Sequence, residues 1–135
     1  MLVFDRAPYT EMLGHTYDGY PLEACGLLAG DAEDGTIVAC YPCRNAAASS
    51  RVFRIDDDDY RRAEDDADRR QLALLAIFHS HTHTEPYPSP TDVEVAEGLG
   101  PWFRWVIVGL KRNGPEVRAY RIADGAITEE RVALR

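Results

Sequence analysis

A continuous apolar segment, Leu72–Phe78, is the feature that most constrains the fold of this chain. It shows no alternation of apolar and polar residues, so a strand built from it would be apolar on both faces. Such strands are typical of sheets that are covered on both sides. The segment is the longest apolar run in the chain, yet it is far shorter than the ~20 residues that cross a bilayer. The sequence therefore predicts a buried central strand and no membrane helix.

Helical and strand-like patterns surround this central strand. Apolar spacing, capping residues and acid–base pairs predict three helices, over residues 6–18, 57–70 and 91–99. Runs of β-prone residues bounded by turn residues predict further strands over residues 25–29, 36–43, 52–55, 102–110, 116–123 and 127–134. Asn113-Gly114 and Asp124-Gly125 are typical hairpin turns. This order predicts an α/β (α+β) fold with a single mixed sheet flanked by helices.

Length and charge narrow the range of functions. A chain of 135 residues is expected to form a single domain over residues 1–135. Its 15 basic and 23 acidic residues give a net charge of −8, and no basic stripe suits a nucleic acid. The first residues lack the basic and apolar regions of a signal peptide, so we expect a cytoplasmic protein. We expect its odd set of cysteines, Cys25, Cys40 and Cys43, to stay reduced.

The acidic helix predicted over residues 57–70 has an ordinary structural explanation. Its aspartates precede arginines by four residues, the orientation that supports an isolated helix. We therefore interpret these charges as a solvated helix face and not as a metal site or a site for a basic partner. The predicted pairs are Asp57 with Arg61, Asp58 with Arg62, Asp65 with Arg69 and Asp66 with Arg70.

The residues that follow the central strand carry the chemistry. His79 and His81 are two residues apart, so on an extended backbone their side chains point to the same face. Asp92 falls in the first turn of the next helix, where a carboxylate is electrostatically favoured. Two imidazoles and one carboxylate leave one coordination position open. This is the ligand count of a catalytic Zn²⁺ site, with one ion per chain and a water in the fourth position.

His83 offers a second register for the same pattern. The pair His81 and His83 would select Thr91 and Glu94 as the downstream residues. Thr91 and Glu94 have the spacing of a capping box at the start of the helix, which is a competing structural role. We therefore predict the first register and expect His83 to be a loop residue that is dispensable for metal binding.

The spacing His79-Ser80-His81, seven residues, Ser89, two residues, Asp92 resembles the motif of the JAMM/MPN-plus metalloproteases. Three further features are similar to this family: the segment over residues 21–28, the helix that comes first, and Asn45 followed by Phe53. The resemblance extends over about residues 6–120. The resemblance implies a partly barrel-like, MPN/cytidine-deaminase-like sheet. It implies that Glu23 moves the proton of the zinc water and that Ser89 stabilises the oxyanion. Cys25, two residues from Glu23, is a candidate inhibitory ligand of the metal.

By this resemblance, the protein is expected to be a zinc-dependent metallopeptidase or isopeptidase. Its expected substrate is an amide bond at the C-terminus of a ubiquitin-like or sulfur-carrier protein, for example a carrier–cysteine adduct. One alternative is a non-catalytic MPN-type protein-binding module, and another is the DNA-repair-associated RadC-like branch, against which the acidic charge argues. Exposed edges of the last strands leave a homo-oligomer open.

Overall fold

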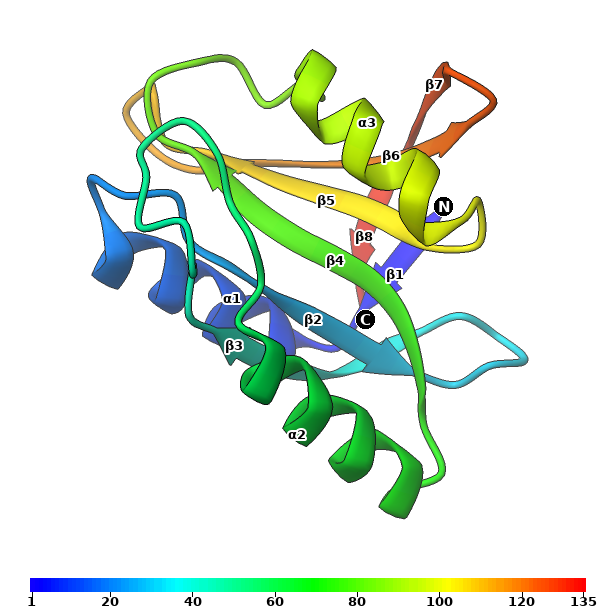
Figure 1. Cartoon of the computed structure of the whole chain (residues 1–135). Coiled ribbons are helices and arrows are strands. Elements are labelled where there is room, and N and C mark those ends of the chain that lie inside the picture. The colour runs from blue at the N-terminus through cyan, green and yellow to red at the C-terminus, as the bar shows by residue number, and fades with distance from the viewer.

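The computed structural model describes all residues of the protein, 1–135, and shows one eight-stranded sheet with three helices (Figure 1). The helices are α1 (Arg6–Gly19), α2 (Asp57–Arg69) and α3 (Pro90–Leu99). The strands are β1 (Leu2–Phe4), β2 (Cys25–Gly30), β3 (Ile37–Cys43), β4 (Ala73–His81), β5 (Arg104–Gly109), β6 (Glu116–Ala123), β7 (Ala126–Glu130) and β8 (Val132–Leu134). None of the helices is long and apolar enough to cross a membrane. All three predicted helices are confirmed.

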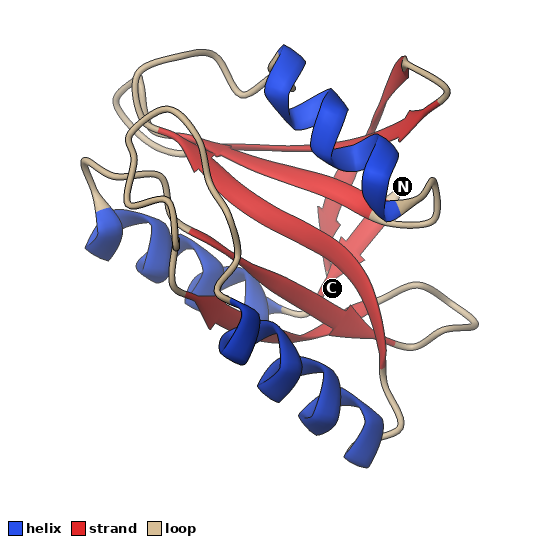
Figure 2. Ribbon diagram, in the orientation of Figure 1, coloured by secondary structure: helices blue, strands red, loops and turns tan.

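The sheet is mixed and strongly curled. Its strands follow the order β7-β6-β5-β4-β2-β3-β1-β8. The pairs β4–β5, β1–β3 and β1–β8 are parallel, and the other neighbours are antiparallel. Val117 of β6 and Val132 of β8 pack against the same core cluster, so the two ends of the sheet approach each other. The predicted mixed, partly barrel-like sheet flanked by helices is confirmed (Figure 2).

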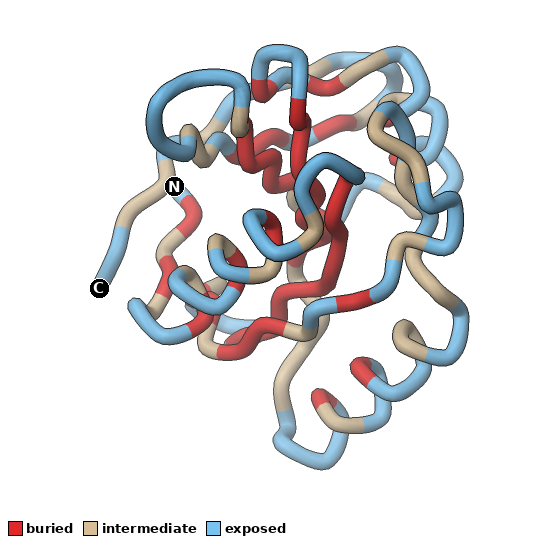
Figure 3. The backbone as a smooth tube through the Cα atoms, turned by 90° about the vertical axis from the view of Figure 1, so that its left-hand side faces the viewer, coloured by how far each residue is buried: buried red, intermediate tan, exposed pale blue.

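The central strand β4 separates two apolar cores, as its sequence predicts. Phe78 belongs to the core that Met12 of α1 covers. Ile77 belongs to the core that Ala63 of α2 and Ala96 of α3 cover. The middle of the sheet is accordingly buried over all of β2, the last six residues of β4 and the last five of β5 (Figure 3). The strand also continues three residues past its predicted end, so that it includes His81.

The strand predicted over residues 52–55 is wrong. Only one isolated bridge, between Asn45 and Ile55, occurs there. The Asn45 side chain takes the place of a neighbouring strand, because its Oδ1 accepts from the backbone N–H of Arg54 and its Nδ2 donates to the carbonyl of Val52. Phe53 is turned inward against the second core. Side-chain hydrogen bonds to the backbone thus shape this segment as a loop.

The last predicted strand, residues 127–134, is two strands. Asp124 and Gly125 take positive φ angles of 52° and 75°, which folds β7 back onto β6 as a hairpin. Strand β8 then leaves this hairpin and pairs in parallel with β1. Strand β1 was not predicted, because three residues carry too little periodicity to be distinguished from a helix start.

The acidic helix α2 is confirmed as a charged helix at the surface, but most of its ion pairs differ from the predicted ones. Asp58 pairs with Arg61 at 2.6 Å and Asp66 with Arg69 at 2.5 Å, both at a spacing of three residues. Among the predicted pairs only Asp66 with Arg70 forms, at 3.6 Å. Both spacings bring side chains together on a helix surface.

Close packing of β2 against its neighbours makes Gly26 sensitive to substitution. A Cβ at this position would lie 2.3 Å from the Phe78 ring and 2.6 Å from the Tyr41 carbonyl oxygen. We predict that Gly26→Ala lowers the free energy of unfolding by about 2 to 3 kcal/mol in chemical denaturation. Gly14→Ala, in the exposed part of α1 with no atom within 4 Å, is the control and should stabilise by ~0.5 kcal/mol. Wild-type stability of Gly26→Ala would contradict this packing.

Candidate metal centre

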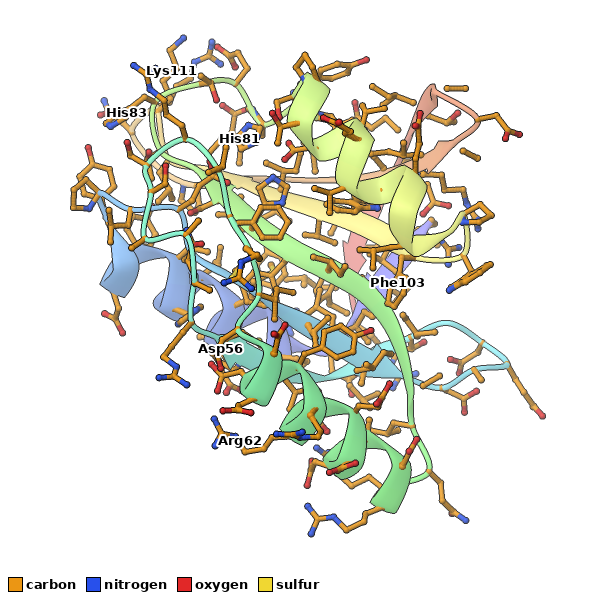
Figure 4. All side chains as sticks on the ribbon, viewed as in Figure 1. Asp56, Arg62, His81, His83, Phe103 and Lys111 are labelled. Atoms are coloured by element: carbon orange, nitrogen blue, oxygen red, sulfur yellow. The ribbon has the colours of Figure 1, made fainter.

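Four side chains from three segments meet where β4 ends, at the place that the His81 label marks in Figure 4. His79 and His81 are on the same face of β4, and both are buried. Asp92 comes from the first turn of α3, and Glu23 from the residues just before β2. The predicted site residues His79, His81, Asp92 and Glu23 are therefore brought together.

The start of α3 holds Asp92 in place. Ser89 is the N-cap, and its Oγ accepts from the backbone N–H of Asp92 at 3.1 Å. Asp92 Oδ2 in turn accepts from the backbone N–H of Ser89 at 2.9 Å. Pro90 occupies the first helical position, where its missing N–H costs nothing. This reciprocal pair is a capping box, so the predicted box of Thr91 and Glu94 is wrong.

Three donor atoms form a nearly equilateral triangle. His79 Nε2 and His81 Nε2 are 3.1 Å apart, and each lies 3.1 Å from Asp92 Oδ2. The edge of a tetrahedron of ligands at the usual zinc distances is ~3.3 Å. The triangle therefore fits three corners of a four-coordinate metal ion and leaves the fourth corner open.

The position of the proton on the His81 ring indicates that His79, His81 and Asp92 share a cation. Its Nδ1 lies 2.8 Å from the backbone carbonyl of Glu85, which can only accept, so Nδ1 carries a proton. In neutral His81 the Nε2 lone pair then faces the carboxylate of Asp92 and the ring nitrogen of His79. Converging lone pairs need a cation between them, and a metal ion meets this need. A hydrogen bond from the second ring nitrogen is also how metal-binding histidines are usually oriented.

Glu23 borders this triangle without joining its hydrogen bonds. One of its carboxylate oxygens lies within 4.8 Å of ring nitrogens of His79 and His81. Its side chain is buried, and Oε1 has no hydrogen-bond partner. An unpaired buried oxygen costs free energy unless a ligand or water completes it. Glu23 is thus available to exchange a proton with a molecule placed at the open corner.

Backbone contacts fix Glu23 against β4 and the loop over residues 44–56. The N–H of Glu23 donates to the carbonyl of Ser49 at 2.8 Å, and Asn45 Nδ2 donates to the carbonyl of Glu23 at 2.9 Å. The next residue, Ala24, donates its N–H to Ser80 Oγ at 2.8 Å. Ser80, between the two histidines, therefore holds the glutamate segment in position.

Further residues support the histidines, and of these the sequence had pointed only to Phe53, through the family resemblance. Phe53 stacks on His79 with ring centroids 4.3 Å apart. The Tyr120 hydroxyl donates to the carbonyl of Pro86 at 2.5 Å, and Arg112 binds the side chain of Glu85 at 2.8 Å. These contacts hold the loop whose carbonyl orients His81. They join residues far apart in the chain, and no local pattern in the sequence marks them.

Burial and hydrogen bonding separate the two carboxylates electrostatically. Burial raises the pKa of Glu23 to about 7. Burial also opposes ionisation of Asp92, but hydrogen bonds with His79 and His81 outweigh it and hold the pKa of Asp92 well below its usual range. Near neutral pH Asp92 is a stable anion, whereas Glu23 is divided between its two protonation states. A carboxyl group with such a pKa can both accept and donate a proton.

Burial also acts on the two histidines, with opposite outcomes. Complete burial lowers the pKa of His79, despite the hydrogen bond to Asp92. Burial opposes protonation of His81 as well, but the hydrogen bonds to Asp92 and to the carbonyl of Glu85 raise its pKa overall. In the metal-free protein, a proton would therefore reside on His81 in preference to His79.

The other predicted candidates lie outside the triangle. His83 is exposed on the loop after β4, at the outer rim of the same end of the molecule (Figure 4). Its ring packs edge-on against the ring of Tyr20, with the ring centroids 6.2 Å apart. Cys25 Sγ is turned toward the carbonyl of Arg44 at 3.6 Å, and burial raises its thiol pKa to about 12. The Cys25 sulfur is not one of the possible ligand atoms that lie together at Glu23, His79 and His81. Cys25, Cys40 and Cys43 are all free thiols.

The curled sheet, its three helices and the buried polar group at the end of β4 define a small α/β domain with a candidate metal centre. The chain belongs to the family of prokaryotic homologs of the JAB domain, whose model matches residues 6–123. It is 40% identical, over 90% of this chain and 82% of the relative, to the CysO-cysteine peptidase of Mycobacterium tuberculosis. A desampylase of Haloferax volcanii is 38% identical over 36% of this chain and 38% of its own.

Solved structures agree with this assignment. The solution structure of a protein from Desulfitobacterium hafniense has a TM-score of 0.89 at 28% identity, covering 100% of this chain and 93% of the other. The crystal structure of a JAB1/MPN domain protein from Archaeoglobus fulgidus has a TM-score of 0.64 at 15% identity, covering 100% and 97%. The second likeness concerns the fold alone. The resemblance to the JAMM/MPN family predicted from the sequence is confirmed.

The raised pKa of Glu23 predicts a cost in stability that depends on pH. Its pKa rises from an ordinary 4.5 to about 7 on folding, so the stability of the metal-free protein falls as the pH rises through this interval. We predict that Glu23→Gln, which cannot ionise, is more stable than the wild type at pH 8 by on the order of 2 kcal/mol. The difference should shrink toward pH 5. Thermal unfolding after chelation measures it, and a constant difference across this range would contradict the assignment.

Proposed function

We propose that this protein is a zinc-dependent peptidase that hydrolyses an amide bond at the C-terminus of a ubiquitin-like or sulfur-carrier protein. The observation that carries the proposal is the triangle of His79, His81 and Asp92 with the unpaired carboxylate of Glu23 beside it. Residues 1–135 would form one catalytic domain.

Zinc suits the donor set better than magnesium or calcium does. Two imidazole nitrogens and one carboxylate oxygen are the ligands of many catalytic zinc sites, whereas magnesium and calcium prefer oxygen ligands throughout. His79, His81 and Asp92 would hold the ion. When bound, zinc supplies a more acidic water and a Lewis acid for the scissile carbonyl.

Glu23 would perform both proton transfers of the hydrolysis. Water adds to the amide carbon and loses a proton to the Glu23 carboxylate. When the C–N bond breaks, Glu23 returns that proton to the leaving amine, so the products are a carboxylic acid and an amine. The pKa of about 7 that burial gives Glu23 suits this exchange near neutral pH.

Ser89 has a hydroxyl proton available for the second role that the family resemblance implies. Its Oγ accepts from the backbone of Asp92, but its own O–H has no acceptor among the hydrogen bonds of the structure. It can therefore donate to the oxyanion that develops on the substrate carbonyl. The same side chain caps α3 and so positions Asp92. One residue would therefore both hold a metal ligand in place and stabilise the transition state.

The relatives support the class of substrate. The Mycobacterium tuberculosis relative is named a CysO-cysteine peptidase, and its similarity extends over most of both chains. The name desampylase points to a protein-modifier substrate for the second relative, whose similarity covers a shorter segment. Both names denote an enzyme that acts on a protein adduct, and this shared feature is what we carry over to the present chain.

Metal content tests the ligand set. We predict about one zinc per chain in the wild type purified without added metal and little in Asp92→Ala, because loss of one of three ligands removes a corner of the site. His83→Ala, which removes an exposed histidine near the site, is the matched control and should retain the metal. Elemental mass spectrometry gives the ratio, and a zinc-free His83→Ala protein would reverse the assigned register.

Turnover tests the role of Glu23. On a small sulfur-carrier protein extended by one C-terminal cysteine, we predict that Glu23→Gln lowers kcat by about 100-fold or more while zinc content stays near one per chain. Glu94→Gln, on the exposed side of α3, is the control and should keep wild-type activity. Release of cysteine is followed by mass spectrometry. An intact adduct after prolonged incubation with zinc-loaded wild type would favour a binding module.

A further inference from the structure

Two of the chain's unpaired cations belong to the loop over residues 44–56, which contacts the candidate metal centre. Most lysine and arginine side chains form an ion pair within 4.0 Å; Arg6, Arg51, Arg54 and Arg131 form none. Arg51 and Arg54 are both exposed and lie three residues apart in the loop over residues 44–56. In a chain with a net charge of −8, two neighbouring arginines without acidic partners need an explanation.

The loop that carries these arginines is tied to the centre on two sides. Its Ser49 carbonyl accepts from the N–H of Glu23 at 2.8 Å. Its Ser50 carbonyl accepts from the hydroxyl of Thr82, which directly follows His81, at 3.3 Å. Its Phe53 stacks on His79. Arg51 thus follows the residue that binds Thr82, and Arg54 follows the residue that stacks on His79.

Other cations at this end of the molecule are already engaged. Lys111 and Arg112, on the turn after β5, both bind the side chain of Glu85, at 3.4 and 2.8 Å. The centre itself contributes the carboxylates of Asp92 and Glu23. With zinc bound, these two carboxylates balance the charge of the ion, so Arg51 and Arg54 are the cations left free to attract a negatively charged group on a substrate.

We propose that Arg51 and Arg54 bind a free α-carboxylate on the residue that follows the scissile amide. The inference rests on the proposed function and adds the residues that would recognise the leaving group of an adduct in which the carrier C-terminus is joined to a single amino acid. Guanidinium groups bind carboxylates through paired, charge-assisted hydrogen bonds. The arginines would thereby select substrates by the group that leaves.

A pair of substrates isolates this interaction. One is a sulfur-carrier protein extended by a C-terminal cysteine, and the other is the same adduct made with cysteinamide, which lacks only the terminal charge. For the wild type we expect kcat/KM to be about 10-fold to 100-fold higher for the carboxylate, mainly through a lower KM. Raising the salt concentration should narrow this difference, because the arginines are exposed.

Substitutions test whether the two arginines cause the difference in kcat/KM between the two substrates. Arg51→Gln and Arg54→Gln, singly and together, should reduce kcat/KM for the carboxylate toward the value for the carboxamide and leave the carboxamide unchanged. Arg6→Gln is the matched control, because this exposed, unpaired arginine begins α1 and does not belong to the loop over residues 44–56. It should preserve the full preference. Zinc content and thermal unfolding of each variant confirm an intact centre.

The outcomes separate the two proposals. Equal cleavage of both substrates by the wild type would overturn the carboxylate inference and leave the peptidase function standing. Cleavage of neither substrate by zinc-loaded wild type would overturn the peptidase function itself. A uniform loss of activity on both substrates in the arginine variants, with zinc retained, would also overturn the inference, because the loop would then act on the centre and not on the carboxylate.

Discussion

The burial of an ionised carboxylate between two imidazole rings is the interaction on which the rest of the structure depends. Asp92 is 5% exposed and His79 is fully buried, so neither can rely on water to stabilise its charge or its polar atoms. A buried charge is tolerated only when it is paired and hydrogen-bonded. The capping box of α3 supplies one donor to Asp92 from the backbone of Ser89, and the two imidazoles face the same carboxylate oxygen, with a shared proton or metal ion to complete the pairing. The first turn of α3 and the last residues of β4 are therefore fixed relative to each other.

This requirement explains why a helix cap and a candidate metal ligand share one side chain. Asp92 Oδ2 accepts from the N–H of Ser89 and faces both histidines, so the geometry that starts the helix also sets the ligand direction. The strand contributes rigidity from the other side, because β4 is hydrogen-bonded to β2 and to β5 along its buried half. Ligands held by a strand and a capped helix keep their positions better than ligands held by loops.

The remaining parts of the centre come from segments that have no regular structure of their own. Asn45 organises the loop over residues 44–56 with hydrogen bonds to the backbone on both sides, and that loop supports Glu23 and covers His79 with Phe53. On the opposite side, the β5–β6 hairpin holds the carbonyl that orients His81. Glu23 pays for its position in stability, since its side chain is buried without a partner for one oxygen. Burial that raises the pKa of a carboxyl group in this way is common where a residue must exchange protons.

The sequence by itself determined the parts of this protein that depend on local periodicity and spacing. The apolar run before His79 specifies a strand buried on both faces, and the two-residue spacing places His79 and His81 on one face. Only the tertiary structure decided the rest. Glu23 reaches the histidines because β2 pairs with β4 in a particular register, the segment around Phe53 is a loop because Asn45 binds its backbone, and β8 pairs with β1 across the whole chain. Contacts between distant residues leave no periodic trace in the sequence, because each depends on the packing of elements that are individually ordinary.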